Sequence, residues 1–492
     1  MKNLRLFETV DEFISDYNNN YIEPWASYTK EVEDVAYNKL IVPDPRDMYL
    51  TFEITSDGVI KWKASYSGLT KTIEYSKDSG TTWTSITSTT GGTDISVVSG
   101  DMVQFRGDNA TYATSGVYVY DYNTFSGTTA SFNVRGNIMS LINKTDFAEL
   151  DTISSSHTFY SLFANCTGLT SAEHLTLPAT TLARVCYSSM FVGCTSLTTA
   201  PALPATTLAQ ECYYSMFGKC TKLSKTSKLP ATTLSDGCYY SMFSGCTSLT
   251  SAPKLPATTL AKNCYTCMFQ GCTGLTKAPE LPATTLAVSC YRGMFQGCTG
   301  LTSAPELPAI RVYDSSYYYM FQGCTNLTTA PELPATSIGA YSYCDMFKNC
   351  TNLINAPELP ATVAPEGCYE NMFENCRSLT TAPALPATAV STESYFGMFK
   401  GCINIVRGPE ISAKYFKNFC FTEMFSGCSK LNYIKCVTNG KESPTAPNPQ
   451  EPTRDWVTGV QTVSGTFVKH PDASWSRGNY GVPNNWTIEN AS

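Results

Sequence analysis

The chain is poor in histidine, in charge and in long apolar runs, and each shortage excludes a class of function. Only three histidines occur among 492 residues, and none has a cysteine, serine or acidic partner at a catalytic or metal-binding spacing. Charged residues are 15% of the chain and the net charge is -7, so no basic stripe for nucleic acid is expected. No apolar run reaches the roughly 18 residues of a membrane span. We therefore expect a soluble protein without enzymatic activity, cofactor, metal or nucleic-acid partner.

Cysteine is abundant, with 21 residues, but its placement argues against a disulfide framework. Most cysteines form two columns with a 26-residue period, Cys186, Cys212, Cys238, Cys264, Cys290, Cys368 and Cys420, and Cys194, Cys220, Cys246, Cys272, Cys298, Cys324, Cys350, Cys376, Cys402 and Cys428. Ser316, Ser342 and Ser394 replace the first column in units where the second keeps its cysteine. Partners in a disulfide would be lost together, so we predict buried free thiols, consistent with assembly in a reducing cytoplasm.

Zinc coordination is the alternative role for these thiols. Cys264 and Cys267 form the only C-x-x-C motif of the chain. A structural zinc site would need a second cysteine pair or histidines beside it, and the sequence supplies neither.

More than half of the chain consists of a repeated sequence unit. Ten 26-residue units run without insertion from Leu177 to Cys436, each on the pattern L-P-A-T-T-L-A-x-x-C-Y-x-x-M-F-x-G-C-T-x-L-T-x-A-P-x. A unit of this size cannot bury its apolar face alone, so the units must stack as a solenoid. The Leu-Thr-x-Ala-Pro-x-Leu stretch predicts a short extended segment, and Cys-Tyr-x-x-Met-Phe predicts a short helical turn. One strand and one helical turn per coil is a leucine-rich-repeat arrangement.

Short sequence motifs of the repeat also resemble a known family. Residues 194–197 (Cys-Thr-Ser-Leu), the Ala-Pro pair at 200–201 and the turn at 213–217 resemble the leucine-rich repeats of the bacterial surface antigen BspA. The resemblance covers roughly residues 137–492. It implies an N-cap with a divergent repeat over 137–176, the ten repeats over 177–436, and a C-terminal cap over 437–492. The family is abundant in gut Bacteroidales and in the tailed phages that infect them.

Residues 1–44 predict an attachment module of α+β type. Thr9-Val10-Asp11-Glu12 has a capping-box pattern at the start of an amphipathic stretch, and acidic residues interrupt the apolar core that a secretory signal would need. The opening segment resembles leaders of virion proteins from Bacteroidales (crAss-like) phages, and the start at Met1 favours an uncleaved N-terminus. Candidate attachment residues are Leu4, Leu6, Phe7, Phe13, Trp25 and Tyr28. A free flexible leader is the alternative.

Residues 45–136 read as alternating strands without cysteine. Tyr49 to Ile54 and Val59 to Ala64 flank Asp57-Gly58, a hairpin signal, and further short strands follow over about 90 residues. This pattern predicts an immunoglobulin-like β-sandwich. Residues 76–83 match the Asp-box S-x-D-x-G-x-T-W, which we interpret as a folding device, a hairpin turn closed by the aspartate and packed by the tryptophan.

Function is expected on the variable positions of the repeat, because packing occupies the invariant ones. Candidate ligand-facing residues are Glu280, Glu306, Glu332 and Glu358 before successive Leu-Pro pairs, and Tyr214, Tyr240, Tyr318 and Tyr319 on the turn side. The glutamates would lie about 5 Å apart and repel one another, so they are either solvated or offset by a cation or basic partner. The tyrosines suit contact with protein or glycan, and packing between coils is the alternative.

The resulting fold expectation is a multidomain, mainly β chain with short helices. The leading functional hypothesis is a head fibre, tail fibre or capsid decoration of a phage virion. Its N-terminus would bind capsid or tail proteins, and its solenoid would bind a bacterial surface glycan or protein, with assembly in the host cytoplasm and a homo-oligomer, taken as a trimer. The alternative is a BspA-like adhesin on the bacterial cell surface, and a glycan-degrading enzyme is a third possibility.

Overall fold

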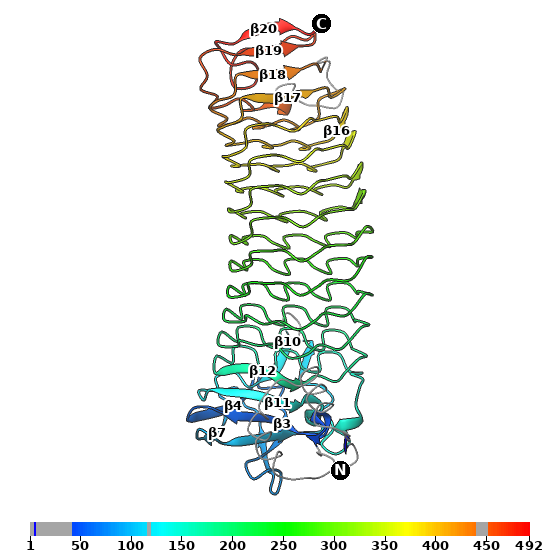
Figure 1. Ribbon diagram of the computed structural model, residues 1–492, viewed down its shortest axis with the longest axis vertical. Helices are drawn as coiled ribbons and strands as arrows, with labels where there is room; N and C mark the ends of the chain where they lie inside the picture. The colour runs from blue at the N-terminus through cyan, green and yellow to red at the C-terminus, as the bar shows by residue number, and fades with distance from the viewer. Residues whose placement is uncertain (1–3, 6–41, 116–119, 439–450) are drawn as a thin grey trace, which may run out of the picture. The chain divides into compact units, whose positions relative to one another are not determined.

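The structure is a computed structural model that describes residues 4–5, 42–115, 120–438 and 451–492. It divides into two compact units, one of residues 1–205 and 220–228, the other of residues 206–219 and 229–492. Each unit is described by itself (Figure 1). Both consist mainly of strands, turns and short 3-10 helices, as the mainly β expectation requires.

The first unit begins with two β-sheets. In Figure 1 their strands carry the blue and cyan colours. β7 (Thr93–Val97), β4 (Gly58–Ala64), β10 (Tyr120–Thr124) and β9 (Ala113–Ser115) form one antiparallel sheet in this order. The other sheet has the order β12 (Leu169–Thr176), β11 (Phe132–Asn137), β3 (Leu50–Ile54), β8 (Met102–Arg106), β5 (Thr72–Ser76) and β6 (Thr84–Thr87). The immunoglobulin-like class of these sheets stays a prediction.

The Asp57-Gly58 hairpin was a wrong prediction. β3 pairs with β11 and β8, whereas β4 pairs with β7 and β10, so this turn connects two sheets. Glycine is needed here for close approach, because a Cβ on Gly58 would lie 2.6 Å from the Ala130 nitrogen. The alternation expected in β4 is confirmed: Ile60, Trp62 and Ala64 are fully buried.

The Asp-box forms the β5–β6 hairpin turn that its residues predict. Asp78 accepts hydrogen bonds from the Thr82 amide at 2.9 Å and the Thr82 hydroxyl at 2.6 Å. These bonds, with one from Ser76, lower the pKa of Asp78 to about 2. The Trp83 indole donates to the Gly80 carbonyl at 3.0 Å, and the Arg106 guanidinium lies 3.9 Å from its ring centroid.

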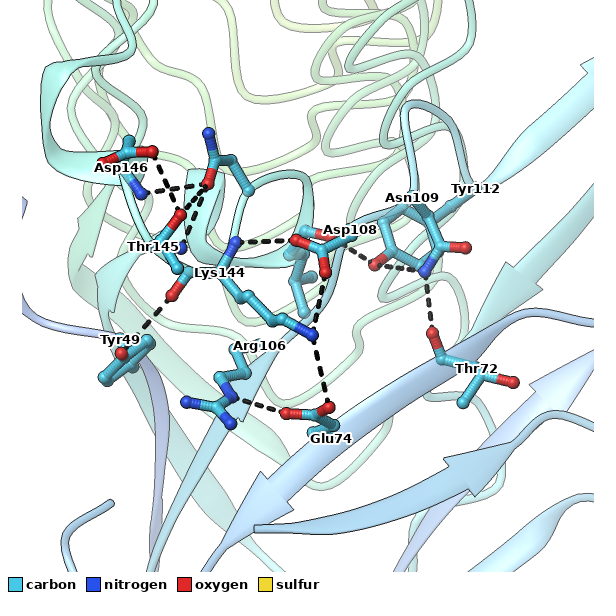
Figure 2. Close-up of polar contacts among 12 residues, drawn as sticks. Tyr49, Thr72, Glu74, Arg106, Asp108, Asn109, Tyr112, Lys144, Thr145 and Asp146 are labelled. Atoms are coloured by element: carbon cyan, nitrogen blue, oxygen red, sulfur yellow. Dashed lines mark hydrogen bonds and ion pairs between the residues drawn. The ribbon is translucent and has the colours of Figure 1, made fainter. Parts of the chain in front are cut away.

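A polar cluster connects the strands of the first unit to the segment that leads into the repeats (Figure 2). The Arg106 guanidinium lies 2.6 Å from Glu74, and the Lys144 ammonium lies 3.6 Å from Glu74 and 3.0 Å from Asp108. Asn109 donates to the Thr72 carbonyl at 2.8 Å. These bonds hold the β5 and β8 strands to the loop between the 3-10 helices η3 (Ile138–Leu141) and η4 (Phe147–Glu149).

The same unit joins its sheets directly to the first coils. β11 pairs antiparallel with β3 and parallel with β12, so one sheet contains strands of both regions. The aromatic columns also begin among the sheet residues: Tyr112 stacks on Phe159, and Phe125 on Phe163 with ring centroids 5.6 Å apart. The Tyr112 amide donates to the Thr158 carbonyl at 2.9 Å. The sheet region therefore stacks on the first coil and hydrogen-bonds to it, as a preceding coil would.

The predicted helical turn in each repeat is wrong. Residues 177–436, all of which the structure describes, contain no helix. Cys-Tyr-x-x-Met-Phe instead forms a ribbon of successive turns in which left-handed residues recur every fourth position, as at Gly237, Ser241 and Gly245 with φ of 62°, 51° and 76°. Alternate amides bond within the coil and to the next coil: Met242 donates to the Tyr239 carbonyl, and Phe243 to the Met268 carbonyl at 2.9 Å.

The extended segment of the repeat is reduced to one paired residue per coil. Parallel bridges join Ser303 to Thr329, Thr329 to Asn355, and Asn355 to Thr381. Two-residue strands form at another corner, where β13 (Arg311–Val312) pairs with β14 (Ser337–Ile338), and β15 (Val363–Ala364) with β16 (Ala389–Val390). The coils therefore stack in parallel register with the 26-residue period.

The interior of the repeats consists of columns of identical side chains. Tyrosine rings from Tyr213 to Tyr395 stack with centroids 5.5–6.0 Å apart, and phenylalanine rings from Phe217 to Phe425 with centroids 5.6–5.9 Å apart. Each such pair adds about 0.5–1.5 kcal/mol beyond burial. All cysteines are free, and all except Cys267 are buried, which agrees with the predicted thiols.

The second unit ends in a parallel sheet of β17 (Arg407–Ile411), β18 (Tyr433–Cys436), β19 (Thr466–Lys469) and β20 (Thr487–Asn490). Figure 1 shows these strands in orange and red. Trp456 is fully buried, and its ring packs at a tilt against Phe425. The Phe425 amide donates a hydrogen bond to the Trp456 carbonyl at 2.8 Å. Trp456 thus packs on the last repeat, while the bounds of the cap stay a prediction.

The predicted attachment residues lie almost entirely beyond the described part of the chain. Only the backbone of Leu4 belongs to it, in the short strand β1 (Leu4–Arg5), which pairs with β2 (Val42–Pro43). Leu6, Phe7, Phe13, Trp25 and Tyr28 lie outside the described residues. The attachment module over 1–44 therefore stays a prediction.

Candidate ligand-binding surface

The thiols of the second cysteine column lie in the interior of the repeats. Each cysteine of the second column donates its Sγ hydrogen to a phenylalanine carbonyl of the preceding coil, as Cys298 does to Phe269 at 3.0 Å and Cys428 to Phe399 at 3.0 Å. Burial raises the pKa of Cys194 and Cys428 to about 12. These groups are inert structural thiols, because only a thiolate is a strong nucleophile.

The four candidate glutamates lie on the outside of the second unit. Glu280, Glu306, Glu332 and Glu358 are all exposed, and none has an ion pair within the described ranges. Glu410 occupies the same repeat position, but Lys435 of the next coil lies 2.8 Å from its carboxylate. The four carboxylates therefore have no ion-pair partner among the described residues. This is compatible both with a solvated strip and with a ligand-binding surface.

The first tyrosine pair packs between coils and keeps an exposed edge. Tyr214 and Tyr240 stack with centroids 4.9 Å apart and planes 19° apart, and Tyr214 is 38% exposed. Each ring in this stack covers one face of its neighbour, so less ring face is left for a ligand to stack on.

The second tyrosine pair forms a small cluster with an arginine. Tyr318 and Tyr319 have ring centroids 3.8 Å apart and hydroxyls 2.7 Å apart. The Arg292 guanidinium lies 4.7 Å from the Tyr318 ring centroid, one coil earlier. Both tyrosines are partly exposed, so the structure brings these predicted residues together on the turn side of the coils.

A charged cluster on the next coils was not predicted from the sequence. The Lys348 ammonium lies 3.1 Å from Asp345 and 2.8 Å from Glu374, and the Cys344 thiol lies 3.7 Å from Glu370. Burial, and then the charges of Asp345 and Glu393, raise the pKa of Glu370 to about 7. Burial and the neighbouring carboxylates also raise the pKa of Cys344, so this thiol is a poor nucleophile.

A sequence signal for this cluster did exist. We count the leucine of each Leu-Pro pair as repeat position 1. The charged residues of the cluster occupy positions 12, 13 and 16 of two consecutive units, 333–358 and 359–384. Earlier units carry serine, threonine, glycine or glutamine at most of these positions. Side chains at one position of adjacent coils become neighbours, so charges 26 residues apart can interact. Within the described ranges, no group of three or more histidine, cysteine, aspartate or glutamate residues could hold a metal ion.

Comparison with known families identifies the repeats. Residues 142–276 and 238–380 match the model of the BspA type leucine rich repeat region, in six copies. The chain thus carries BspA-type leucine-rich repeats over these residues. Searches of curated proteins and of solved structures found no match. Among the described residues, no helix is long and apolar enough to cross a membrane.

Proposed function

We propose that the BspA-type leucine-rich repeats of this chain bind a bacterial surface ligand as part of a phage virion. In this proposal the chain is a head fibre, tail fibre or capsid decoration. Residues 1–44 attach it to capsid or tail proteins, and the sheets that follow form an immunoglobulin-like sandwich between attachment module and repeats. The protein is assembled in the host cytoplasm as a homo-oligomer, taken as a trimer, and it acts without enzymatic activity.

One observation carries the binding role: the repeats keep a constant interior and change their exterior. The stacked Tyr and Phe columns and the thiol column persist from coil to coil, whereas the exposed positions carry glutamate, tyrosine, arginine or lysine. A stack with constant packing can hold different side chains at fixed spacing without loss of stability. Such a surface suits recognition of an extended ligand.

The thiols support the virion over a secreted protein. Their Sγ hydrogens are donated to backbone carbonyls inside the coils, so the packing uses the reduced form of each thiol. Reduced thiols persist in the cytoplasm, where virions assemble, and are oxidised more readily in secreted proteins. The second candidate is a BspA-like adhesin of the bacterial surface, and the family match is compatible with both candidates.

Mass spectrometry separates the two candidates. The peptides of this chain should be found in gradient-purified virions at a fixed ratio to the capsid protein. Their absence from virions, together with their presence in a washed bacterial cell-surface fraction, would refute the virion role and establish the adhesin.

The attachment assignment has its own test. Deletion of residues 1–44 should abolish incorporation into particles while the purified protein keeps the unfolding midpoint of the full chain. Incorporation at the full-length level would show that another segment makes the attachment.

A further inference from the structure

A groove of about 360 Å3 opens on the outside of the second unit between two adjacent coils. It is lined by residues 277–282 of one coil and by residues 303–306 and 308 of the next. Pockets for small ligands begin at a volume of roughly 300 Å3. We infer that this groove binds one or two units of a neutral saccharide.

The two coils are not hydrogen-bonded to each other along the groove. Proline has no amide hydrogen, so Pro279, Pro282, Pro305 and Pro308 cannot donate to a neighbouring coil. No backbone hydrogen bond joins residues 278–282 to 304–308, a fully described stretch. Lys277 and Ser303 are bridged to other coils, to Ser251 and Thr329, but not to each other. The same gap in the bridges occurs between Lys225 and Ser251.

The lining has the mixed chemistry that a sugar needs. Proline rings and alanine methyl groups form apolar walls for the C–H groups of a pyranose ring. The carboxylates of Glu280 and Glu306 accept hydrogen bonds, while Lys277 and the Ser303 hydroxyl donate them. Each sugar hydroxyl both donates and accepts, so a ligand rich in hydroxyl groups can satisfy both kinds of group at once.

The charges of the groove argue for a neutral ligand. Glu280, Glu306 and Lys277 have no ion-pair partner in the part of the chain that the structure describes. The two carboxylates repel an anionic ligand, and because they outnumber the Lys277 ammonium, repulsion alone does not exclude a cation. A cation has no acceptor for the donors of Lys277 and Ser303, whereas a neutral saccharide can form hydrogen bonds with these donors and with both carboxylates. This inference rests on the proposed function and specifies the ligand class of the same surface.

The test uses the full chain with defined probes. Maltotetraose, cellotetraose and mannotetraose are the neutral probes, tetralysine is the cationic probe, and tetragalacturonate is the anionic probe. Binding is measured by ligand-observed nuclear magnetic resonance and by calorimetry. At least one neutral tetrasaccharide should bind, and both charged probes should bind at least tenfold more weakly.

A matched pair of variants locates the binding. Ser303→Trp fills the groove and should weaken binding of the neutral probe at least tenfold. Asn355→Trp changes the same repeat position two units later, where the residue is bridged to both neighbouring coils through Thr329 and Thr381, and should leave binding unchanged. Equal unfolding midpoints of the two variants show that the loss is not a folding defect.

Several results would overturn the inference. They are no binding of any neutral probe, tighter binding of a charged probe, or equal effects of the two substitutions. Binding of both variants to bacterial cells is measured in parallel. If cells bind the full chain and Ser303→Trp equally, the groove inference fails and the proposed function stands. If cells do not bind the full chain at all, the proposed function fails.

Discussion

At the scale of single residues, the buried thiols act as hydrogen-bond donors and as filling of the interior. Cys298→Ala removes the Sγ bond to the Phe269 carbonyl and leaves a small void. We expect a loss of about 1–2 kcal/mol in the free energy of unfolding. Cys267→Ala is the control, because this thiol is only partly buried, and it should cost less than about 0.5 kcal/mol. Urea unfolding of both variants measures the difference, and equal losses would contradict a special role of the column.

Glu370 gives a prediction for the pH dependence. Its folded-state pKa is about 7, above the ordinary value of 4.5, so the folded state binds the proton more tightly than the unfolded chain does. Its contribution to stability therefore falls as pH rises from about 4.5 to about 7. Glu370→Gln removes this fall, so the variant should gain stability relative to the natural chain between pH 5 and pH 8. The unfolding midpoints at both pH values test this, and a constant difference would refute the assigned environment.

Residue-level reasoning from the sequence found the thiols and the Asp-box because each depends on local spacing. It identified the exposed glutamates and both tyrosine pairs as candidates, but it could not predict that Tyr318 and Tyr319 contact each other. The cluster of Lys348 with Asp345 and Glu374 was missed because it joins repeat positions across coils. Its geometry depends on the exact stacking of the turn ribbon.

At the scale of the element, the turn ribbon explains why a helix was expected. Buried residues at positions 10, 11, 14, 15 and 18 of the repeat fit the 3.6-residue period of a helix, and they fit a four-residue turn period equally well. The recurrent glycine at position 17, as at Gly245 and Gly297, was the discriminating signal. Left-handed backbone at this position favours glycine, and a helix does not.

This backbone conformation predicts a graded response at Gly297, where φ is 71°. Gly297→Asn should cost only a few tenths of a kcal/mol, because Asn349 and Asn375 occupy the same position with φ of 62° and 61°. Gly297→Val should cost about 2 kcal/mol or more, since a β-branched residue is strained there. Thermal unfolding of both variants gives the order, and equal costs would argue against the left-handed turn.

At the scale of the whole molecule, the 26-residue period predicts which deletions are tolerated. Removal of residues 229–254 takes out one complete unit and keeps every column in register, so the chain should fold with cooperative unfolding. Removal of residues 229–241 places hydrophilic turn positions where interior tyrosine, methionine and phenylalanine belong. Circular dichroism and limited proteolysis should show a protease-sensitive second unit only for the shorter deletion. Equal resistance of both proteins would contradict register-dependent stacking.

The sequence predicted the BspA-type repeats and the mainly β fold, while the domain bounds and the ligand-facing residues stay predictions. It did not predict that β11 joins β3 and β12 in one sheet, or that Tyr112 and Phe125 begin the aromatic columns. These pairings connect segments with unrelated sequence patterns, so the periodicity of the repeats does not predict them. The division between the strands of residues 45–136 and the repeats is therefore less sharp in the structure than in the sequence.

The most direct measurement of the central claim is the binding of the labelled full chain to bacterial cells, compared with one surface variant. The variant combines Glu280→Gln, Glu306→Gln, Tyr318→Ala and Tyr319→Ala, all at exposed or partly exposed positions of the repeats. We predict at least a tenfold loss of cell binding with the unfolding midpoint changed by only a few degrees. Wild-type binding by this variant would show that the variable columns do not carry the recognition.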